Sequence, residues 1–135
     1  MPCELCDRTG GELLWQGARC RVVHVGEPGY PGFCRVIWQA HVKEMTDLPD
    51  AQRIHFMEVV FAVEAVLREQ LQPVKINLAS LGNAVPHLHW HVIPRFADDA
   101  HFPQPIWSTP TRPLTSARVP PPVSALADAI AAALD

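Results

Sequence analysis

The stretch NAVPHLHWHVIPRF, residues 83–96, decides the fold class of this chain. Within it, three histidines alternate with three large apolar residues: His87, His89 and His91 with Leu88, Trp90 and Val92. Strict alternation is the period of a half-buried β-strand, on which every second side chain points to the same face. We therefore expect a strand over residues 87–94 that turns its apolar residues into a core and its histidines to the opposite face. Pro94 is expected to close this strand, because proline cannot donate to the hydrogen bonds of a central ladder.

The rest of the chain adds further strands and one long helix. Apolar and β-branched runs between turn residues predict strands at 13–17, 18–25, 33–39 and 74–80. In between, apolar residues recur at helical spacing, which predicts a helix over residues 50–71, with Asp47 as its N-cap and Pro73 beyond its end. This order predicts an α+β fold with a five-stranded antiparallel sheet covered by one helix. The apolar face of the helix is broad enough to pack on a second subunit as well.

The carboxyl-terminal part has a different composition. A chain of 135 residues is long enough for one domain with a real core. We expect that domain over residues 1–110, followed by a proline-rich linker and a short alanine-rich helix within residues 111–135, capped by Ser124.

Charge and hydropathy exclude several classes of partner. The formal net charge is −3 and there is no lysine- or arginine-rich tract, which argues against a nucleic-acid partner. No apolar run approaches the ~20 residues of a membrane span, and the chain does not begin with a signal-peptide pattern. We expect no membrane partner and a cytoplasmic protein.

The four cysteines fall into two groups. Cys20 and Cys34 lie inside expected strands and are interpreted as small core residues. Cys3 and Cys6 form a C-x-x-C pair, which is half of a zinc site, a redox pair or an unrelated pair of thiols. A structural disulfide is the weakest interpretation in a reducing cytosol.

Three histidines on one strand face have three interpretations. They are unrelated exposed residues, or ligands of a catalytic metal, or a phosphoryl-transfer site in which one imidazole is the nucleophile and its neighbours hold the phosphate. Neutral imidazole is nucleophilic, and adjacent donors stabilise charge on phosphate oxygens. The residues alone leave the metal and phosphoryl interpretations open.

The segment PHLHWHVIPR resembles the signature of the histidine triad (HIT) family, in which three histidines alternate with apolar residues. Gly82-Asn83 stands where the family commonly has Gly-Gln, and Asn77 lies near its usual strand asparagine. RVIWQAH, ending at His41, is similar to the family's LVIPKxH, and CELC stands where many bacterial members carry C-x-x-C. The resemblance covers roughly residues 3–107 and includes the order of strands and helix.

The resemblance implies a homodimeric nucleotide hydrolase or transferase. It would act at the α-phosphate of a nucleoside phosphoramidate or dinucleoside polyphosphate and require no cofactor for catalysis. His89 is then expected to attack phosphorus and form a nucleotidyl-histidine, His91 to bond the phosphate and His87 to support the site. The expected substrate-binding residues are Asn77, Asn83 and, through its backbone N–H, Ala84. The alternative is a nucleotide- or zinc-binding regulatory module with little turnover.

The chain also departs from the family pattern. Val25 stands where an acidic residue often binds ribose, Ala84 replaces a common Ser or Thr, and Trp38 replaces a proline. These differences bear more on the substrate than on the reaction.

Several residues have both a structural and a functional interpretation. A structural zinc site of Cys3, Cys6, His41 and His87 is expected by analogy with some bacterial relatives of the family. Arg95 is either a surface charge at a strand end or a substrate contact. Phe102 and Trp107 either pack on the core or form a lid over a base.

Overall fold

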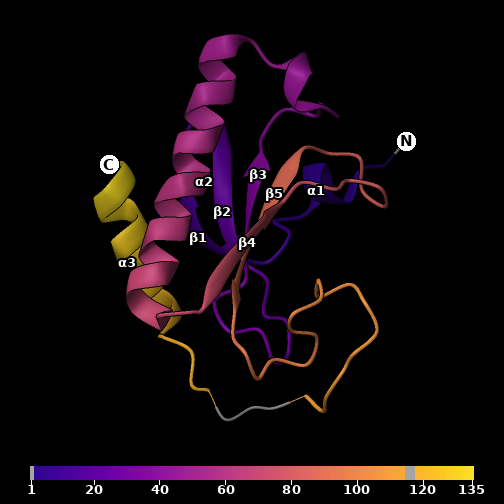
Figure 1. The fold of residues 1–135 in the computed structure, drawn as a ribbon. Coiled ribbons are helices and arrows are strands. Elements are labelled where there is room, and N and C mark those ends of the chain that lie inside the picture. Colours follow the sequence, from indigo (N-terminus) through magenta and orange to yellow (C-terminus); the bar gives the residue numbers. More distant parts are fainter. Residues whose placement is uncertain (1, 115–117) are drawn as a thin grey trace.

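The computed structural model describes residues 2–114 and 118–135, which are built on one antiparallel sheet (Figure 1). The sheet contains β1 (Glu12–Gln16), β2 (Cys20–His24), β3 (Cys34–Trp38), β4 (Lys75–Ala79) and β5 (His89–Arg95). Their order across the sheet is β1-β2-β3-β5-β4, and every neighbouring pair is antiparallel. The expected α+β class with five strands is confirmed.

The histidine strand lies between β3 and β4, where it is paired on both sides. It begins at His89 and not at His87. Just before it, the Leu88 carbonyl accepts from the N–H of Trp38, the last residue of β3, and the Leu88 N–H donates to the carbonyl of Val42, beyond that strand. Pro94 does not close it: Pro94 lies opposite Ile76, and the Arg95 carbonyl still accepts from the Val74 N–H. The alternation itself is confirmed, since Leu88, Trp90 and Val92 all pack into the main core.

The long helix α2 (Asp50–Leu71) has the predicted bounds and lies across one face of the sheet (Figure 1). Asp47 does not cap it. Asp47 instead belongs to a short 3-10 turn, η1 (Met45–Asp47), where its carboxylate accepts from the Glu44 N–H at 3.1 Å, and the helix N-cap is Pro49. The helix ends where Gln72 adopts a left-handed conformation just before Pro73.

The main core lies between α2 and the sheet. Phe56, near the start of α2, packs against Trp38 of β3 with ring centroids 5.0 Å apart. Cys20 and Cys34 are fully buried in this core, as expected of small apolar residues.

A second helix, α3 (Val123–Leu134), packs against α2 and β1 (yellow in Figure 1). Its Leu126 and Ile130 are fully buried in the same core. Ser124 does not cap it, because the helix starts one residue earlier, after Pro122. The domain boundary at residue 110 stays a prediction.

A short helix that the sequence analysis missed, α1 (Glu4–Asp7), lies near the start of the chain. Within the described residues, no helix combines the length and apolar character needed to cross a membrane.

Candidate functional site

The three histidines of the signature lie together, but they are less open than expected. His89 and His91 are 7% and 6% exposed, and His87 is fully buried. Two segments cover this face of the sheet. Leu5 of α1 packs on Val23 and Ile37, and Trp107, in the segment after β5, meets the ring of His91. The alternating pattern identified the face correctly, but it carried no information on these distant covering segments.

His89 has one ring nitrogen occupied. Its Nδ1 lies 2.6 Å from the carbonyl oxygen of His87, and since a carbonyl can only accept, Nδ1 must carry the proton. The neutral ring therefore has an unprotonated Nε2. Burial lowers the pKa of His89 and Arg35 adds to this, whereas the hydrogen bond to His87 opposes it. The backbone is also fixed, because the Ser80 hydroxyl donates to the His89 carbonyl at 2.8 Å.

His91 is surrounded by rings. Its centroid lies 4.9 Å from that of His89, 5.7 Å from Phe33 and 5.1 Å from Trp107, all tilted edge to face. Its Nδ1 is buried and has no hydrogen-bond partner among residues 2–114 and 118–135. Burial, with the nearby His89 and Arg35, lowers the pKa of His91 to about 4, so the ring is neutral at pH 7.

His87 faces a different group of residues. Its Nδ1 lies 3.3 Å from the Cys3 Sγ, 3.4 Å from the Cys6 Sγ and 3.3 Å from the His41 Nδ1. The Cys6 Sγ and His41 Nδ1 are 3.4 Å apart, and all four donor atoms lie within 4.8 Å of one another. The structure thus brings together the four residues that the sequence analysis grouped.

This cluster fits a tetrahedral zinc ion. Zn–S and Zn–N bonds of about 2.3 and 2.0 Å place ligand atoms roughly 3.3–3.8 Å apart. The four short separations in the cluster are 3.3–3.4 Å. In addition, His87 Nε2 donates to the Trp38 carbonyl at 2.6 Å, so its Nδ1 is free of a proton and available to a metal.

Arg21 of β2, which the sequence analysis missed, holds the C-x-x-C segment in place. Its guanidinium donates to the carbonyls of Leu5, Arg8 and Thr9 at 2.7–3.0 Å and to the Gln39 side chain at 2.6 Å. A charged residue in the middle of an apolar strand is the signal that would have marked it. The same signal marks Arg35 on β3, which lies directly opposite His91.

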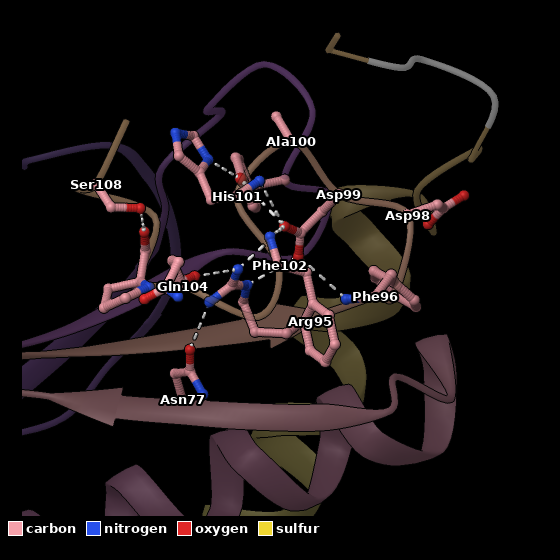
Figure 2. A network of polar contacts seen from close by, with 12 residues as sticks. Asn77, Arg95, Phe96, Asp98, Asp99, Ala100, His101, Phe102, Gln104 and Ser108 are labelled. Carbon is pink, nitrogen blue, oxygen red and sulfur yellow. Dashed lines mark hydrogen bonds and ion pairs between the residues drawn. The ribbon is translucent and has the colours of Figure 1, made fainter. Parts of the chain in front are cut away.

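Arg95 lies at the far end of β5 and is neither a surface charge nor open to substrate (Figure 2). It is 2% exposed and makes a two-pronged ion pair with Asp99, at 2.8 and 3.0 Å. It also donates to the Gln104 carbonyl at 2.7 Å and to the Asn77 Oδ1 at 2.8 Å. The Asn77 Oδ1 is thus engaged by Arg95, and its amide N–H groups make no hydrogen bond within the described residues. Phe102 packs over the guanidinium, 5.6 Å away.

Asn83 and Ala84 lie in the exposed turn between β4 and β5. Nearby is a hollow of about 300 Å³ lined by Ser80, Gly82, His87 and His89, together with residues 43–46. Leu81, Leu88 and Trp90 also line this hollow, which therefore opens at the start of β5, next to the turn that holds Asn83 and Ala84.

The comparisons with known proteins agree with this geometry. The HIT domain family model matches residues 11–98, from the first strand to beyond the histidine strand. AP-4-A phosphorylase of Mycobacterium tuberculosis is 32% identical over 81 residues, which cover 56% of this chain and 42% of the relative. The chain thus spans less than half the length of these curated relatives.

Solved structures share the fold. A histidine triad protein of Sinorhizobium meliloti is 25% identical, with a TM-score of 0.75 over 99% of this chain and 96% of that one. One from Bradyrhizobium japonicum is also 25% identical, with a TM-score of 0.72 over 91% of both chains. A Zn-bound histidine triad family protein of Mycobacterium smegmatis, 22% identical, has a TM-score of 0.65 over 99% of this chain and 94% of that one.

The family model spans all five strands and the complete histidine row, and the structure folds those residues as its relatives do. This chain is a member of the histidine triad family.

Proposed function

We propose that this protein is a nucleotide hydrolase or transferase that acts at the α-phosphate of a nucleoside phosphoramidate or a dinucleoside polyphosphate. The observation that carries the proposal is the state of His89. Its Nδ1–H is held by the His87 carbonyl at 2.6 Å, which leaves Nε2 unprotonated in the neutral ring, and His89 is one of the residues that line the hollow at the start of β5. The AP-4-A phosphorylase relative supports a dinucleoside polyphosphate as one substrate class.

The proposed reaction has two displacements at phosphorus. The His89 Nε2 lone pair forms an N–P bond while the bond to the leaving group breaks, and the leaving group departs with that electron pair and takes up a proton. Water, or phosphate in a phosphorylase, then attacks the nucleotidyl-histidine. The N–P bond breaks, its electron pair returns to Nε2 and the nucleotide product is released.

The neighbouring residues are proposed to hold the phosphate. His91 lies 4.9 Å from His89, centroid to centroid, and bonds a phosphate oxygen. The turn residues Asn83 and Ala84 offer an amide side chain and a backbone N–H beside the hollow, and Asn77 offers its remaining amide N–H groups. His87 supports the site through its carbonyl.

We also propose that Cys3, Cys6, His41 and His87 hold a structural zinc ion. Bound there, zinc would offset the charge of the two thiolates and tie the amino-terminal segment to the sheet. The arrangement supports a structural role, because His87 turns its Nδ1 toward the cysteines and away from the reaction. Among the described residues, the triad imidazoles do not form a comparable group of converging donors.

A homodimer is proposed from the outer face of α2. Ile54 and Phe61, seven residues apart and hence on one side of the helix, are 62% and 53% exposed. At the edge of the sheet, β4 has one side unpaired within the described chain. Analytical ultracentrifugation of the wild type and of Phe61→Glu tests this assembly.

Mass spectrometry of the intact protein tests the reaction. The protein is mixed with a panel of adenosine and guanosine phosphoramidates and dinucleoside polyphosphates and quenched within seconds. We expect a mass increase of one nucleotidyl group, located on His89 and absent from His89→Ala. His55→Ala, which removes a histidine from α2, is the matched control and should form the adduct.

The same experiment addresses the alternative. Tight nucleotide binding without an adduct or turnover would indicate a binding module. The observation that favours this outcome is the low exposure of His89 and His91.

A further inference from the structure

Three arginines lie on the strands of the sheet with their side chains wholly or partly buried, and two of them are fully bonded within the protein. Arg21 makes four hydrogen bonds and Arg95 makes four, two of them to a carboxylate. Arg35 differs from both. It makes a single long hydrogen bond, 3.3 Å to the Gly10 carbonyl, and its Nε is buried with no partner.

Arg35 also lacks a counter-ion. Within residues 2–114 and 118–135, no carboxylate lies within ion-pair distance of it. The carboxylates of Glu4 and Glu27, which raise the pKa of Arg35 through their charge, belong to exposed residues. A partly buried guanidinium costs free energy unless its donors and its charge are matched, and nothing in the described chain matches this one.

The position of Arg35 connects it to the histidines. It lies directly opposite His91 on the neighbouring strand, and residues opposite each other in an antiparallel pair share a face. The ring of Phe33 is near both, 6.0 Å from the guanidinium carbon and 5.7 Å from the His91 ring centre. The positive charge of Arg35 contributes to the lowered pKa of both His89 and His91.

We propose that Arg35 is a substrate-binding residue of the triad site and that its ligand is the phosphate of the nucleotide. A planar guanidinium with free N–H groups matches two oxygens of one phosphate, and the weak bond to Gly10 is readily exchanged for such a contact. A ligand phosphate would supply both the missing acceptors and the missing negative charge. This inference rests on the proposed function for the identity of the substrate, but the binding of a phosphate beside the histidines does not depend on turnover.

Binding of nucleoside monophosphates and of their nucleosides separates a phosphate contact from a base contact. Calorimetry is performed with adenosine and guanosine 5′-monophosphates, adenosine and guanosine, on the wild type, Arg35→Gln, Arg35→Lys and Arg19→Gln. Arg19 is exposed, makes no side-chain hydrogen bond within the described chain and controls for the loss of one positive charge.

We expect Arg35→Gln to weaken binding of the monophosphate at least tenfold and to leave nucleoside binding within twofold. Arg35→Lys should recover part of the loss, because it restores the charge without the two-pronged geometry, and Arg19→Gln should match the wild type. Equal losses for monophosphate and nucleoside, or an unchanged monophosphate affinity in Arg35→Gln, would overturn the proposal. If Arg35→Gln does not fold, monophosphate binding by Arg35→Lys that equals the wild type at every salt concentration would overturn it as well.

Adduct formation by the wild type keeps the two proposals apart. A wild type that forms nucleotidyl-His89 while Arg35→Gln binds monophosphate normally removes only the role of Arg35. A wild type that forms no adduct but loses monophosphate affinity through Arg35→Gln removes only the proposed reaction.

Discussion

The two ends of β5 carry polar clusters of opposite kinds, one built on a buried ion pair and one partly exposed. At the far end, Arg95 and Asp99 form an ion pair. The backbone N–H groups of Phe96, His101 and Phe102 also donate hydrogen bonds to the Asp99 carboxylate (Figure 2). At the near end, the ligand atoms of Cys3, Cys6, His41 and His87 converge, and none of these four residues is a lysine or an arginine. The first cluster holds the segment that directly follows β5, whereas the second joins the amino-terminal cysteines to the start of the same strand.

The difference between them separates structural from ligand-dependent polar groups. A cluster whose donors, acceptors and charges all match is complete within the chain, whereas a cluster of like donors is completed by something that binds. His89 and His91 lie between the two ends, and each has a ring nitrogen that makes no hydrogen bond within the described part of the chain.

The largest effect is expected from His89→Ala. Removal of the nucleophile removes the covalent route, so kcat/KM should fall by at least about 10³-fold, in the range seen when a catalytic nucleophile is deleted. Steady-state kinetics on the best substrate of the panel measure this. Wild-type turnover by the variant would contradict the assignment of the nucleophile.

At the far end of β5, Asp99→Asn should destabilise the protein by about 3 kcal/mol, because it leaves the buried Arg95 charge uncompensated. Urea unfolding measures the change. The matched control is Asp98→Asn, since Asp98 pairs with Arg118 on the surface, and that exposed pair is worth at most about 1 kcal/mol. Equal effects of the two variants would contradict the distinction between them.

The same carboxylate predicts the acid response. Burial by itself would raise the pKa of Asp99, but hydrogen bonds from Arg95 and from backbone N–H groups outweigh it and lower the pKa to about 2. Because the folded pKa is below the unfolded value of 3.8, the stabilisation is complete above pH 3.8 and disappears as the pH falls through 2. Asp99→Asn should therefore lose stability less steeply than the wild type over this window.

At the near end of β5, removal of the proposed zinc by a chelator should lower the melting temperature by about 5 °C or more. A loss of ~1–2 kcal/mol has this effect in a domain of this size. Activity should largely remain, because the proposed zinc does not touch phosphorus. Both are measured on one chelated sample, with Cys3→Ser/Cys6→Ser as a variant that should no longer respond. Lost activity at unchanged melting temperature, restored by zinc, would instead indicate metal catalysis.

The smallest effect concerns His91. Its folded pKa of about 4 lies below the unfolded value of 6.5, so its contribution to stability is complete above pH 6.5 and decreases as the pH falls toward 4. At pH 5.5 the loss relative to pH 7.5 should be roughly 1 kcal/mol. Unfolding of His91→Gln, compared with the wild type at both pH values, isolates this contribution. The variant should show a smaller difference between the two pH values.

The fold was largely predictable because its signals are local. The alternation in β5 and the helical spacing of α2 each extend over one element, and the bounds of the helix were predicted correctly. Helix caps were less predictable, because Asp47 and Ser124 are good capping residues that the chain uses elsewhere or not at all.

The site was predictable only as far as a motif reached. The family resemblance grouped Cys3 with His87 across 84 positions. No motif connects Arg95 to Asn77 or Trp107 to His91: the first contact arises from the pairing of β5 with β4, and the second from the path of the segment after β5. The burial of the triad depends on that path, which explains why the sequence suggested a more open face.

His87 serves its two neighbours through different atoms. Its ring faces the cysteines, while its main-chain oxygen holds the His89 ring. A main-chain oxygen is the same whichever side chain position 87 carries. Metal affinity and nucleophile orientation can therefore diverge independently: a lineage can lose the cysteines, or an engineer can replace the metal ligands by an apolar contact, and the reactive imidazole keeps its tautomer. Relatives without C-x-x-C would then have lost the metal ligands while keeping the orientation of the reactive histidine.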